Sequence, residues 1–255
     1  MIKVTNLHKG FSGVAVLKGI STSFEAGKTN LIIGQSGSGK TVFLKSLIGL
    51  HTPEEGSIEF DGRINLGMST EQRRQLRQEI GMVFQGSALF DSLTVEENVM
   101  FPLKMFTKKS DKEMLERANF VLQRVDLVGS NQKYVSELSG GMQKRVAIAR
   151  AIVMEPKYLF CDEPNSGLDP QTAIIIDNLI NEITKEFNIT TVINTHDMNS
   201  VMEIGEKILF LKDGKKAWEG SNKEIFKTEN EAVVNFVYSS NLFKKVREAY
   251  LNETK

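Results

Sequence analysis

Hydrophobic and polar residues follow different periods in different parts of the chain, and each period predicts a type of element. Apolar and polar positions alternate over residues 2–7 and 16–24, which predicts two strands. Gly10, Ser12 and Gly13 indicate a turn between them. Continuous apolar runs are typical of strands buried on both faces of a sheet. Such runs occupy residues 30–33, 80–84 and 158–161, and the β-branched segment 190–194 predicts a further buried strand.

Helical periodicity dominates the middle of the chain. One helix is expected to begin at Thr94, and apolar residues three to four positions apart predict another over residues 111–125. Further helices are expected over residues 42–50, 139–152 and 170–187. The block over about 86–150 is therefore interpreted as a helical subdomain inserted into an α/β core.

Short elements complete the pattern. Residues 57–60 predict a strand after turn residues at 53–56, which favours an antiparallel flank beside the first two strands. Residues 207–211 and 215–219 predict a hairpin. The apolar residues of the segment 221–255 are spaced as in helices, so we expect a helical tail there.

A glycine-rich segment separates the strand at 30–33 from the helix at 42–50. It reads Gly34-Gln35-Ser36-Gly37-Ser38-Gly39-Lys40-Thr41, which is a complete G-x-x-x-x-G-K-[ST] motif. Its glycines let successive backbone N–H groups point at one spot, where the positive end of the helix dipole adds to them. Lys40 would reach the β- and γ-phosphates, and the Thr41 hydroxyl would bind Mg²⁺. An ordinary turn requires neither residue, so the segment predicts nucleoside triphosphate binding.

Composition and charge restrict the class of protein. The 255 residues include 40% hydrophobic residues, enough for one large α/β domain or one domain with a subdomain. Lys plus Arg and Asp plus Glu both number 32, so no overall field would attract nucleic acid. The single Cys161 lies in an apolar run, which suits a reducing compartment.

The sequence also predicts a location. The chain begins directly with strand-like alternation and shows no secretory leader. No apolar stretch approaches the roughly 20 residues that span a bilayer, because Pro102 and Lys104 interrupt the richest one, residues 99–106. We expect a cytoplasmic protein, and any membrane span in its system would come from another chain.

A second glycine loop opens the helix predicted at 139–152. Ser139, Gly140 and Gly141 stand at its start, where free N–H groups and the helix dipole create a site for an anion. An ordinary serine N-cap would explain this loop if it stood alone. Because the chain already holds one phosphate loop, a second phosphate contact is the preferred interpretation.

Polar residues end three of the predicted buried strands. Gln85 follows one strand, Asp162 and Glu163 follow the next, and His196 comes just after the last. Open parallel sheets bind ligands beyond these strand ends. Adjacent carboxylates there point in different directions, one toward a metal and one toward a nearby water. Separately, Phe11 in the first turn could stack on a purine, although a buried core position is commoner for phenylalanine.

These motifs occur in an order that resembles the ATP-binding-cassette (ABC) ATPase family over nearly all of residues 1–220. The resemblance implies an α/β fold of P-loop NTPase type, with a RecA-like core, an antiparallel β flank and an inserted helical subdomain. It implies an ABC domain over 1–220 with the subdomain at about 86–150, followed by the tail at 221–255. It also implies a head-to-tail dimer in which each ATP lies between the phosphate loop of one copy and the Ser139 loop of the other.

The resemblance assigns roles to single residues. Residues 34–41 would hold the phosphates, Asp162 would hold Mg²⁺ through water, and Gln85 would sense both the metal and the attacking water. Glu163 resembles the base that polarises this water, and His196 would contact the γ-phosphate. The residues that would act on the opposite copy's ATP or at the dimer seam are Ser139, Gly140, Gly141 and Asp169.

Two positions depart from the family pattern. Phe11 stands where a tyrosine usually stacks on adenine, which keeps the aromatic face and loses a hydroxyl. Gly167 replaces an alanine in the seam loop but leaves Asp169 in place. Base stacking and hydrolysis are both expected to survive these changes.

The segment over residues 85–103 resembles the Mla-type subgroup, whose ATPases serve phospholipid transporters that contain MCE proteins. This resemblance implies a transmembrane permease, an MCE protein and a STAS-domain partner, with the chain peripheral on the cytoplasmic face of the inner membrane. An apolar patch would receive a short permease helix, unless it fills the subdomain's own core. The patch consists of Leu89, Phe90, Met100, Phe101, Met105 and Phe106.

Two alternatives are a different ABC transport system, such as one for lipoprotein release or cell division, and a non-transport ABC switch ATPase. Switch ATPases usually carry two cassettes or a long coiled-coil insertion, and the sequence contains neither.

Overall fold

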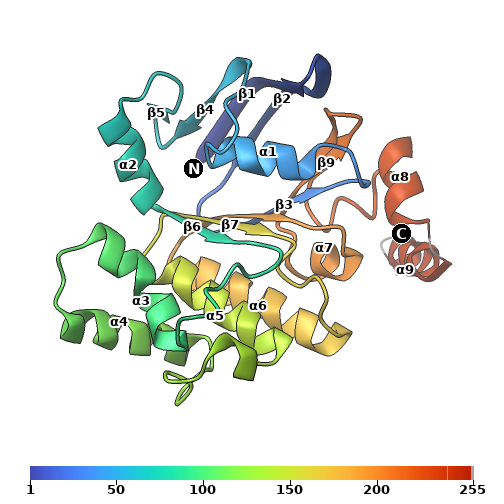
Figure 1. Cartoon of the computed structure of the whole chain (residues 1–255). Coiled ribbons are helices and arrows are strands. Elements are labelled where there is room, and N and C mark those ends of the chain that lie inside the picture. The colour runs from blue at the N-terminus through green and yellow to red at the C-terminus, as the bar shows by residue number, and fades with distance from the viewer. Residues whose placement is uncertain (240, 254–255) are drawn as a thin grey trace. The chain divides into compact units, whose positions relative to one another are not determined.

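The computed structural model describes residues 1–239 and 241–253 of the chain, which divide into two compact units (Figure 1). The first unit comprises Met1–Gly67 and Val192–Lys255, the blue and the orange-to-red ends of the ribbon. The second unit comprises Met68–Thr191. The predicted domain boundary at 220 stays a prediction, and residues 240 and 254–255 of the predicted tail lie outside the described residues.

An antiparallel sheet in the first unit has the strand order β2-β1-β4-β5. Its strands are β1 (Ile2–Phe11), β2 (Val14–Phe24), β4 (Glu55–Phe60) and β5 (Arg63–Ile64). Ile2 pairs with Phe24 on one side and with Phe60 on the other, and all three side chains are buried. The sheet is the predicted antiparallel flank, held by one apolar face.

The first hairpin is tighter than the sequence predicts. Both strands extend beyond the expected ranges, Phe11 pairs with Val14, and only Ser12 and Gly13 form the turn. Both turn residues have positive φ, of 49° and 81°, as two-residue hairpin loops require. The expectation that Phe11 lies in the turn is therefore wrong, because register shifts carry the pairing past Gly10.

The predicted turn at 53–56 is also shorter in the structure, since β4 begins at Glu55. Gly56 has a φ of 90°, and a Cβ there would lie 2.3 Å from the Asn6 carbonyl oxygen. The missing side chain lets β4 approach β1 closely enough to pair.

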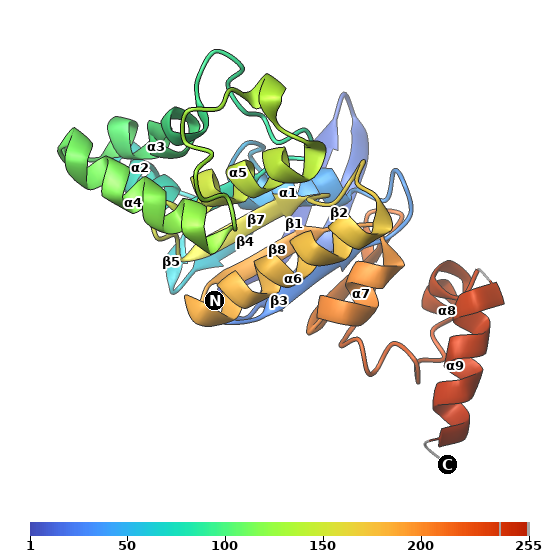
Figure 2. The same ribbon diagram turned by 90° about the horizontal axis from the view of Figure 1, so that it is seen from below.

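The remaining strands of the first unit surround the glycine-rich segment. Strand β3 (Thr29–Ile33) pairs in parallel with β9 (Lys207–Lys212), and β9 forms the predicted hairpin with β10 (Lys215–Gly220). The helices of this unit are α1 (Lys40–Leu47), α7 (Met198–Ile204), α8 (Glu231–Val237) and α9 (Asn241–Glu253). Helices α8 and α9 lie side by side (Figure 2), where Arg247 donates hydrogen bonds to the carbonyl oxygens of Phe226 and Thr228.

The second unit contains most of the helices. They are α2 (Thr70–Gln78), α3 (Val95–Phe106), α4 (Asp111–Arg124), a short 3-10 helix (Val135–Glu137), α5 (Gly140–Ile152) and α6 (Pro170–Glu186). Its strands β6 (Ile80–Val83) and β7 (Tyr158–Asp162) are parallel neighbours, and β8 (Thr190–Asn194) crosses the boundary between the units. Helices α3, α4 and α5 pack against one another (Figures 1 and 2), so most of the predicted helical block forms one cluster.

Local sequence sets where these helices begin. Ser69, Thr94 and Ser110 each cap a helix by accepting a hydrogen bond from the backbone N–H three residues on. The side chain at that third residue bonds back to the backbone N–H of the cap, which completes a capping box. Each cap contributes about 1 kcal/mol to the stability of its helix. The predicted start at Thr94 is confirmed.

The apolar runs form the cores of the two units. Every residue of β3, β7 and β8 is buried, as predicted. The run at 80–84 is not buried on both faces, because Ile80 and Met82 are half-buried and Phe84 is exposed. Cys161 is buried in β7, and this burial raises the pKa of its thiol far above the ordinary value. Within residues 1–239 and 241–253, no helix has both the length and the apolar character needed to cross a bilayer.

Candidate functional site

The glycine-rich loop links β3 to α1 in the first unit. Gly34, Gly37 and Gly39 all have φ values between 79° and 150°, where other residues would be strained. A Cβ at Gly34 would lie 2.2 Å from the Leu211 carbonyl oxygen, whereas one at Gly37 would meet no atom within 4 Å. Gly34 is thus required by packing. Glycine is required at residue 37 by the backbone conformation, and there is open space around this residue.

Polar side chains gather around this loop. Lys40 is buried, and its Nζ donates hydrogen bonds to the carbonyl oxygens of Gly34 at 2.9 Å and Gln35 at 3.1 Å. The hydroxyl of Ser38 is buried without a hydrogen-bond partner. Buried polar atoms in this state are rare and cost stability unless a ligand or water satisfies them. The loop therefore fits an anion that accepts hydrogen bonds.

Thr41 is an exposed residue in the first turn of α1. The Nδ2 of Asn194 donates to its hydroxyl oxygen at 3.3 Å, and Asn194 is buried at the carboxyl end of β8. Sequence reasoning missed this residue. The signal was a polar residue that ends an otherwise apolar and β-branched run.

His196 lies two residues beyond Asn194 and is exposed. The backbone N–H of Thr195 donates to the Ile32 carbonyl oxygen at 3.1 Å, which joins this segment to the end of β3. Because the glycine-rich loop begins two residues after Ile32, His196 stands at the same strand end as that loop. The prediction that His196 comes just after a buried strand is confirmed, and its contact with the γ-phosphate stays a prediction.

Phe11 ends β1 with 42% of its surface exposed, so of the two possibilities left open by the sequence it takes the exposed one, and its stacking on adenine stays a prediction. The His51 ring lies edge-on to it, with ring centroids 5.1 Å apart, and the Lys9 Nζ lies 5.0 Å from its centroid. Glu54 accepts hydrogen bonds from the Lys9 Nζ at 3.1 Å and the Gly10 N–H at 2.9 Å. The bond from Lys9 is the main reason that the pKa of Glu54 is lowered. These contacts hold the aromatic ring at the surface.

Gln85 and Glu163 meet in the second unit. Val83 of β6 pairs with Cys161 of β7, and Gln85 and Glu163 each follow two residues later. The Nε2 of Gln85 accordingly donates to the Glu163 Oε2 at 2.9 Å and lies 3.4 Å from the Ser166 hydroxyl oxygen. Parallel register therefore explains why residues 78 positions apart in sequence come together.

The two adjacent carboxylates occupy different environments, as the sequence predicts. Asp162 is buried as the last residue of β7. Glu163 has a φ of 47° and is half-buried, with its carboxylate against Gln85. Left-handed backbone at a non-glycine residue is uncommon and clusters at functional sites. The turn in the backbone separates the two side chains.

The second glycine loop forms the N-terminus of helix α5. Ser139 caps α5, and its hydroxyl accepts a hydrogen bond from the Met142 N–H at 3.3 Å. The serine cap, which was the alternative interpretation of this loop, is therefore present, and the second phosphate contact stays a prediction. Ser139 and Gly140 are exposed there. A Cβ at Gly141 would lie 2.8 Å from the Thr172 Cγ2, so this loop packs against the start of α6.

Asp169 belongs to the same corner of the second unit. It caps α6 by accepting a hydrogen bond from the Thr172 N–H at 3.0 Å, and contacts with Thr172 lower the pKa of its carboxyl group. Thr172 thus contacts both Gly141 and Asp169. Gly167 has a φ of 81°, a conformation that glycine adopts without strain.

The predicted site residues form two groups. The first unit holds Phe11, the loop 34–41 and His196, and the second unit holds Gln85, Asp162, Glu163, the loop 139–141 and Asp169. Among the described residues, no three His, Cys, Asp or Glu side chains gather as metal ligands. The oxygen donors of Thr41 and Asp162 are nevertheless of the type that Mg²⁺ prefers.

Comparisons with known proteins agree with this fold. Residues 17–166 match the family described as ABC transporter. The chain is 37% identical to the probable ribonucleotide transport ATP-binding protein mkl of Mycobacterium leprae, over 91% of this chain and 67% of that protein. It is 38% identical to the methionine import ATP-binding protein MetN of Campylobacter jejuni, over 94% of this chain and 76% of that protein.

Solved structures show the same likeness. The dimeric structure of MJ0796, a bacterial ABC transporter cassette, superposes with a TM-score of 0.79 and 33% identity, over 87% of this chain and 99% of that one. A second structure of that cassette, in a post-hydrolysis state with ADP and Pi, superposes with a TM-score of 0.78.

This chain belongs to the ABC transporter family. It has the mixed α/β fold of an ABC cassette and is an ATPase, the ATP-binding subunit of a transporter. The predictions of fold and of enzyme class are thereby confirmed. The named relatives act on other substrates, so the resemblance to the Mla-type subgroup stays a prediction.

Proposed function

We propose that two copies of this chain pair head-to-tail around two ATP molecules and that hydrolysis drives lipid transport through a separate permease. The observation that carries the nucleotide assignment is the loop at 34–39, where Lys40 folds over two carbonyl oxygens and the Ser38 hydroxyl is buried without a partner. A triphosphate supplies the acceptor oxygens that such a loop needs.

In this proposal the first unit binds the nucleotide. The N–H groups of residues 34–39 and the Lys40 ammonium hold the phosphates, and the exposed Phe11 ring stacks on adenine. His196 contacts the γ-phosphate from the neighbouring strand end. Asn194 orients the Thr41 hydroxyl so that one of its lone pairs can bind Mg²⁺.

The second unit supplies the chemistry. Asp162 would hold Mg²⁺ through water, and the ion would supply positive charge beside the phosphates. Glu163 accepts a hydrogen bond from the attacking water and polarises it. Gln85 donates to the Glu163 carboxylate at 2.9 Å, which fixes the direction in which that carboxylate faces. These residues act by position and charge rather than by covalent catalysis.

The dimer follows from the second glycine loop. The N-terminus of α5 points free N–H groups outward at the exposed Ser139 and Gly140, which suits the γ-phosphate of the opposite copy's ATP. Asp169 lies in the same corner through Thr172 and would face the dimer seam. The solved structure of MJ0796 is itself dimeric, which supports this arrangement.

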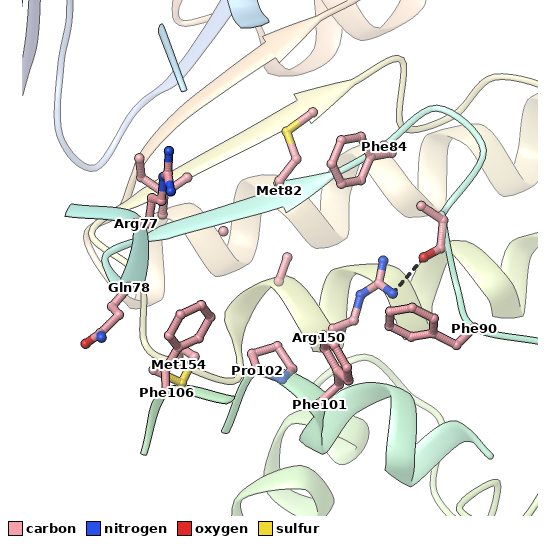
Figure 3. A pocket seen from close by; sticks show the side chains of 14 residues that line it. Arg77, Gln78, Met82, Phe84, Phe90, Phe101, Pro102, Phe106, Arg150 and Met154 are labelled. Carbon is pink, nitrogen blue, oxygen red and sulfur yellow. Dashed lines mark hydrogen bonds between the residues drawn. The ribbon is translucent and has the colours of Figure 1, made fainter. Parts of the chain in front are cut away.

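A groove of about 290 Å³ in the second unit is the proposed permease contact (Figure 3). Its lining is largely apolar and includes Met82, Phe84, Phe90, Phe101, Phe106 and Arg150. The predicted patch divides, because Met100 is buried in the core while Phe90 and Met105 are 41% and 56% exposed. A short amphipathic helix from the permease would place its apolar face in this groove.

Replacing Phe90 with Asp should uncouple the cassette from its permease, because a carboxylate would be desolvated in the groove. We expect permease-stimulated ATP turnover to fall about tenfold or more while ATP binding by the isolated chain is retained. Reconstituted complexes in vesicles would measure both quantities. Phe120→Asp is the matched control, since Phe120 is similarly exposed, at 46%, on α4 and does not line the groove. Equal stimulation of parent and Phe90→Asp complexes would remove the groove from the proposal.

The lipid substrate rests on the resemblance of residues 85–103 to Mla-type ATPases. The same resemblance supports an MCE protein and a STAS-domain partner, with the chain peripheral on the cytoplasmic face of the inner membrane. Methionine and ribonucleotides, the substrates in the relatives' names, are the competing candidates.

Purification of the intact complex through a tag on this chain tests the substrate. We expect mass spectrometry to find bound phospholipid, and phospholipid to stimulate ATP turnover by the complex. Stimulation by methionine or by ribonucleotides in its place would contradict lipid transport and leave the ATPase assignment standing.

A further inference from the structure

The loop that joins β6 to α3 has an unusual backbone. Ser87 and Ala88 have φ values of 62° and 49°, so two consecutive non-glycine residues adopt the left-handed region. L residues rarely adopt this conformation, and surrounding contacts must hold them there. Within this connection, the segment 85–90 begins at Gln85 beside Glu163 and ends at Phe90 in the groove. It therefore connects the hydrolytic carboxylate to the proposed permease contact.

Arg150 holds the strained part of the loop. Its NH1 donates to the Ala88 carbonyl oxygen and its NH2 to the Ser87 carbonyl oxygen, both at 2.8 Å. Figure 3 shows the guanidinium group beside the Phe90 ring, with one of these bonds drawn, and its central carbon lies 5.9 Å from the ring centroid. A planar guanidinium group can donate two bonds in fixed directions, which an ammonium group cannot do.

Lys144 and Asn98 hold the two ends of the loop. The Nζ of Lys144, a buried residue of α5, donates to the Gln85 carbonyl oxygen. Asn98 of α3 accepts a hydrogen bond from the Phe90 N–H at 2.8 Å and donates to the Phe90 carbonyl oxygen at 3.1 Å. The loop thus has side-chain contacts at its start, at its strained turn and at Phe90.

Lys144 and Arg150 belong to the same helix, whose N-cap is Ser139. Helix α5 runs without interruption from Gly140 to Ile152, so Arg150 stands about 15 Å along the axis from Gly140. Packed protein interiors have low compressibility and transmit strain. Any displacement of its N-terminal loop is then carried to the carbonyl oxygens that Lys144 and Arg150 hold.

We propose that Arg150 and Lys144 are positioning residues through which helix α5 transmits a displacement of its Ser139 end to the loop at 85–90, and so to the groove beside Phe90. The link to ATP rests on the proposed contact between the Ser139 loop and the opposite copy's nucleotide. The positioning of the loop rests only on the hydrogen bonds described above. The two parts can therefore fail separately.

Hydrogen exchange measured by mass spectrometry on the full chain tests both parts. Arg150→Lys keeps the positive charge and loses the two-bond fork. In the absence of nucleotide, we expect amide exchange over residues 86–91 to accelerate on the order of tenfold in this variant, because two charge-assisted hydrogen bonds are weakened. With Mg²⁺ and ATP at concentrations that saturate each protein, the parent should show altered exchange over the same residues, and Arg150→Lys should lose at least half of that response.

Arg145→Lys is the matched control. Arg145 lies on the same helix but donates to the Val125 carbonyl oxygen and to Asp126, away from the loop. This variant should match the parent in both conditions. Lys144→Met provides a second test through the Gln85 carbonyl oxygen, and exchange across α5 itself reports whether each variant is folded.

Each outcome has a definite meaning. Unchanged exchange over residues 86–91 in both folded variants without nucleotide would overturn the positioning role. Faster exchange in those variants, combined with no ATP response in a parent that binds ATP, would overturn transmission through α5. A parent that binds no ATP in a separate equilibrium measurement would instead contradict the proposed function, while the measurement without nucleotide would still decide the positioning role.

Discussion

Replacing Glu163 with Gln should abolish most ATP turnover and leave the chain paired around bound ATP. The amide has nearly the same shape as the carboxylate but cannot polarise water as a base does. Loss of a general base costs on the order of 10²–10⁴-fold in rate. Its oxygen can still accept the hydrogen bond that Gln85 donates, so the surrounding geometry should survive. Phosphate release measures the rate, and light scattering with ATP and Mg²⁺ should show a doubled mass.

Glu182→Gln is the control for this experiment. Glu182 lies on α6 in the same unit, where its carboxylate forms an exposed ion pair with Arg124 at 3.1 Å. Exposed ion pairs contribute little to stability, so this variant should turn over ATP at the parent rate. A Glu163→Gln protein that hydrolyses ATP as fast as the parent would contradict the assigned base. One that stays monomeric with saturating ATP would contradict the paired mechanism.

Lys40→Ala should remove most of the affinity for ATP. The Lys40 Nζ lies over the loop, within hydrogen-bond distance of two carbonyl oxygens, where it would meet the β- and γ-phosphates. Loss of a charge-assisted hydrogen bond costs about 1.5–3 kcal/mol, which corresponds to a Kd about 10–150-fold higher. Isothermal titration calorimetry with ATP and Mg²⁺ measures this change.

Lys45→Ala separates the loss of this particular contact from a general loss of charge. Lys45 lies in the last turn of the same helix, at the end away from the glycine-rich loop. Its replacement should leave the affinity within about twofold of the parent, as is usual for surface positions. Equal Kd values for the parent and Lys40→Ala would show that the loop at 34–41 does not hold the phosphates in the way proposed.

The fold could be predicted locally wherever the apolar and polar residues of an element follow one clear period. The apolar runs that became β3, β7 and β8 are buried on both faces and carry no competing signal. Helix α3 begins after Thr94, the start that the sequence predicts, and α4 covers nearly all of the predicted range 111–125. The first hairpin was mispredicted because Gly10 looks like a turn residue, whereas cross-strand pairing with β2 carries it into a strand.

The sequence could predict which motifs make up the candidate site, but it could not predict which side chains contact one another there. The glycine spacing at 34–41 determines a phosphate loop because few other backbones can present so many N–H groups to one point. The exposure of Phe11 was open from the sequence, since an aromatic beside a turn can be buried or exposed. The structure places it at the exposed end of β1, with the His51 ring edge-on to it.

By itself, the sequence determined that this chain binds a nucleoside triphosphate and belongs among the ABC ATPases, because those properties reside in short segments whose residue types and spacing suffice. Only the tertiary structure decided which distant residues meet: Gln85 with Glu163, Asn194 with Thr41, and Arg150 with the strained turn at 87–88. Such contacts depend on strand register and on the packing of α5, and neither leaves a local signal in the order of amino acids.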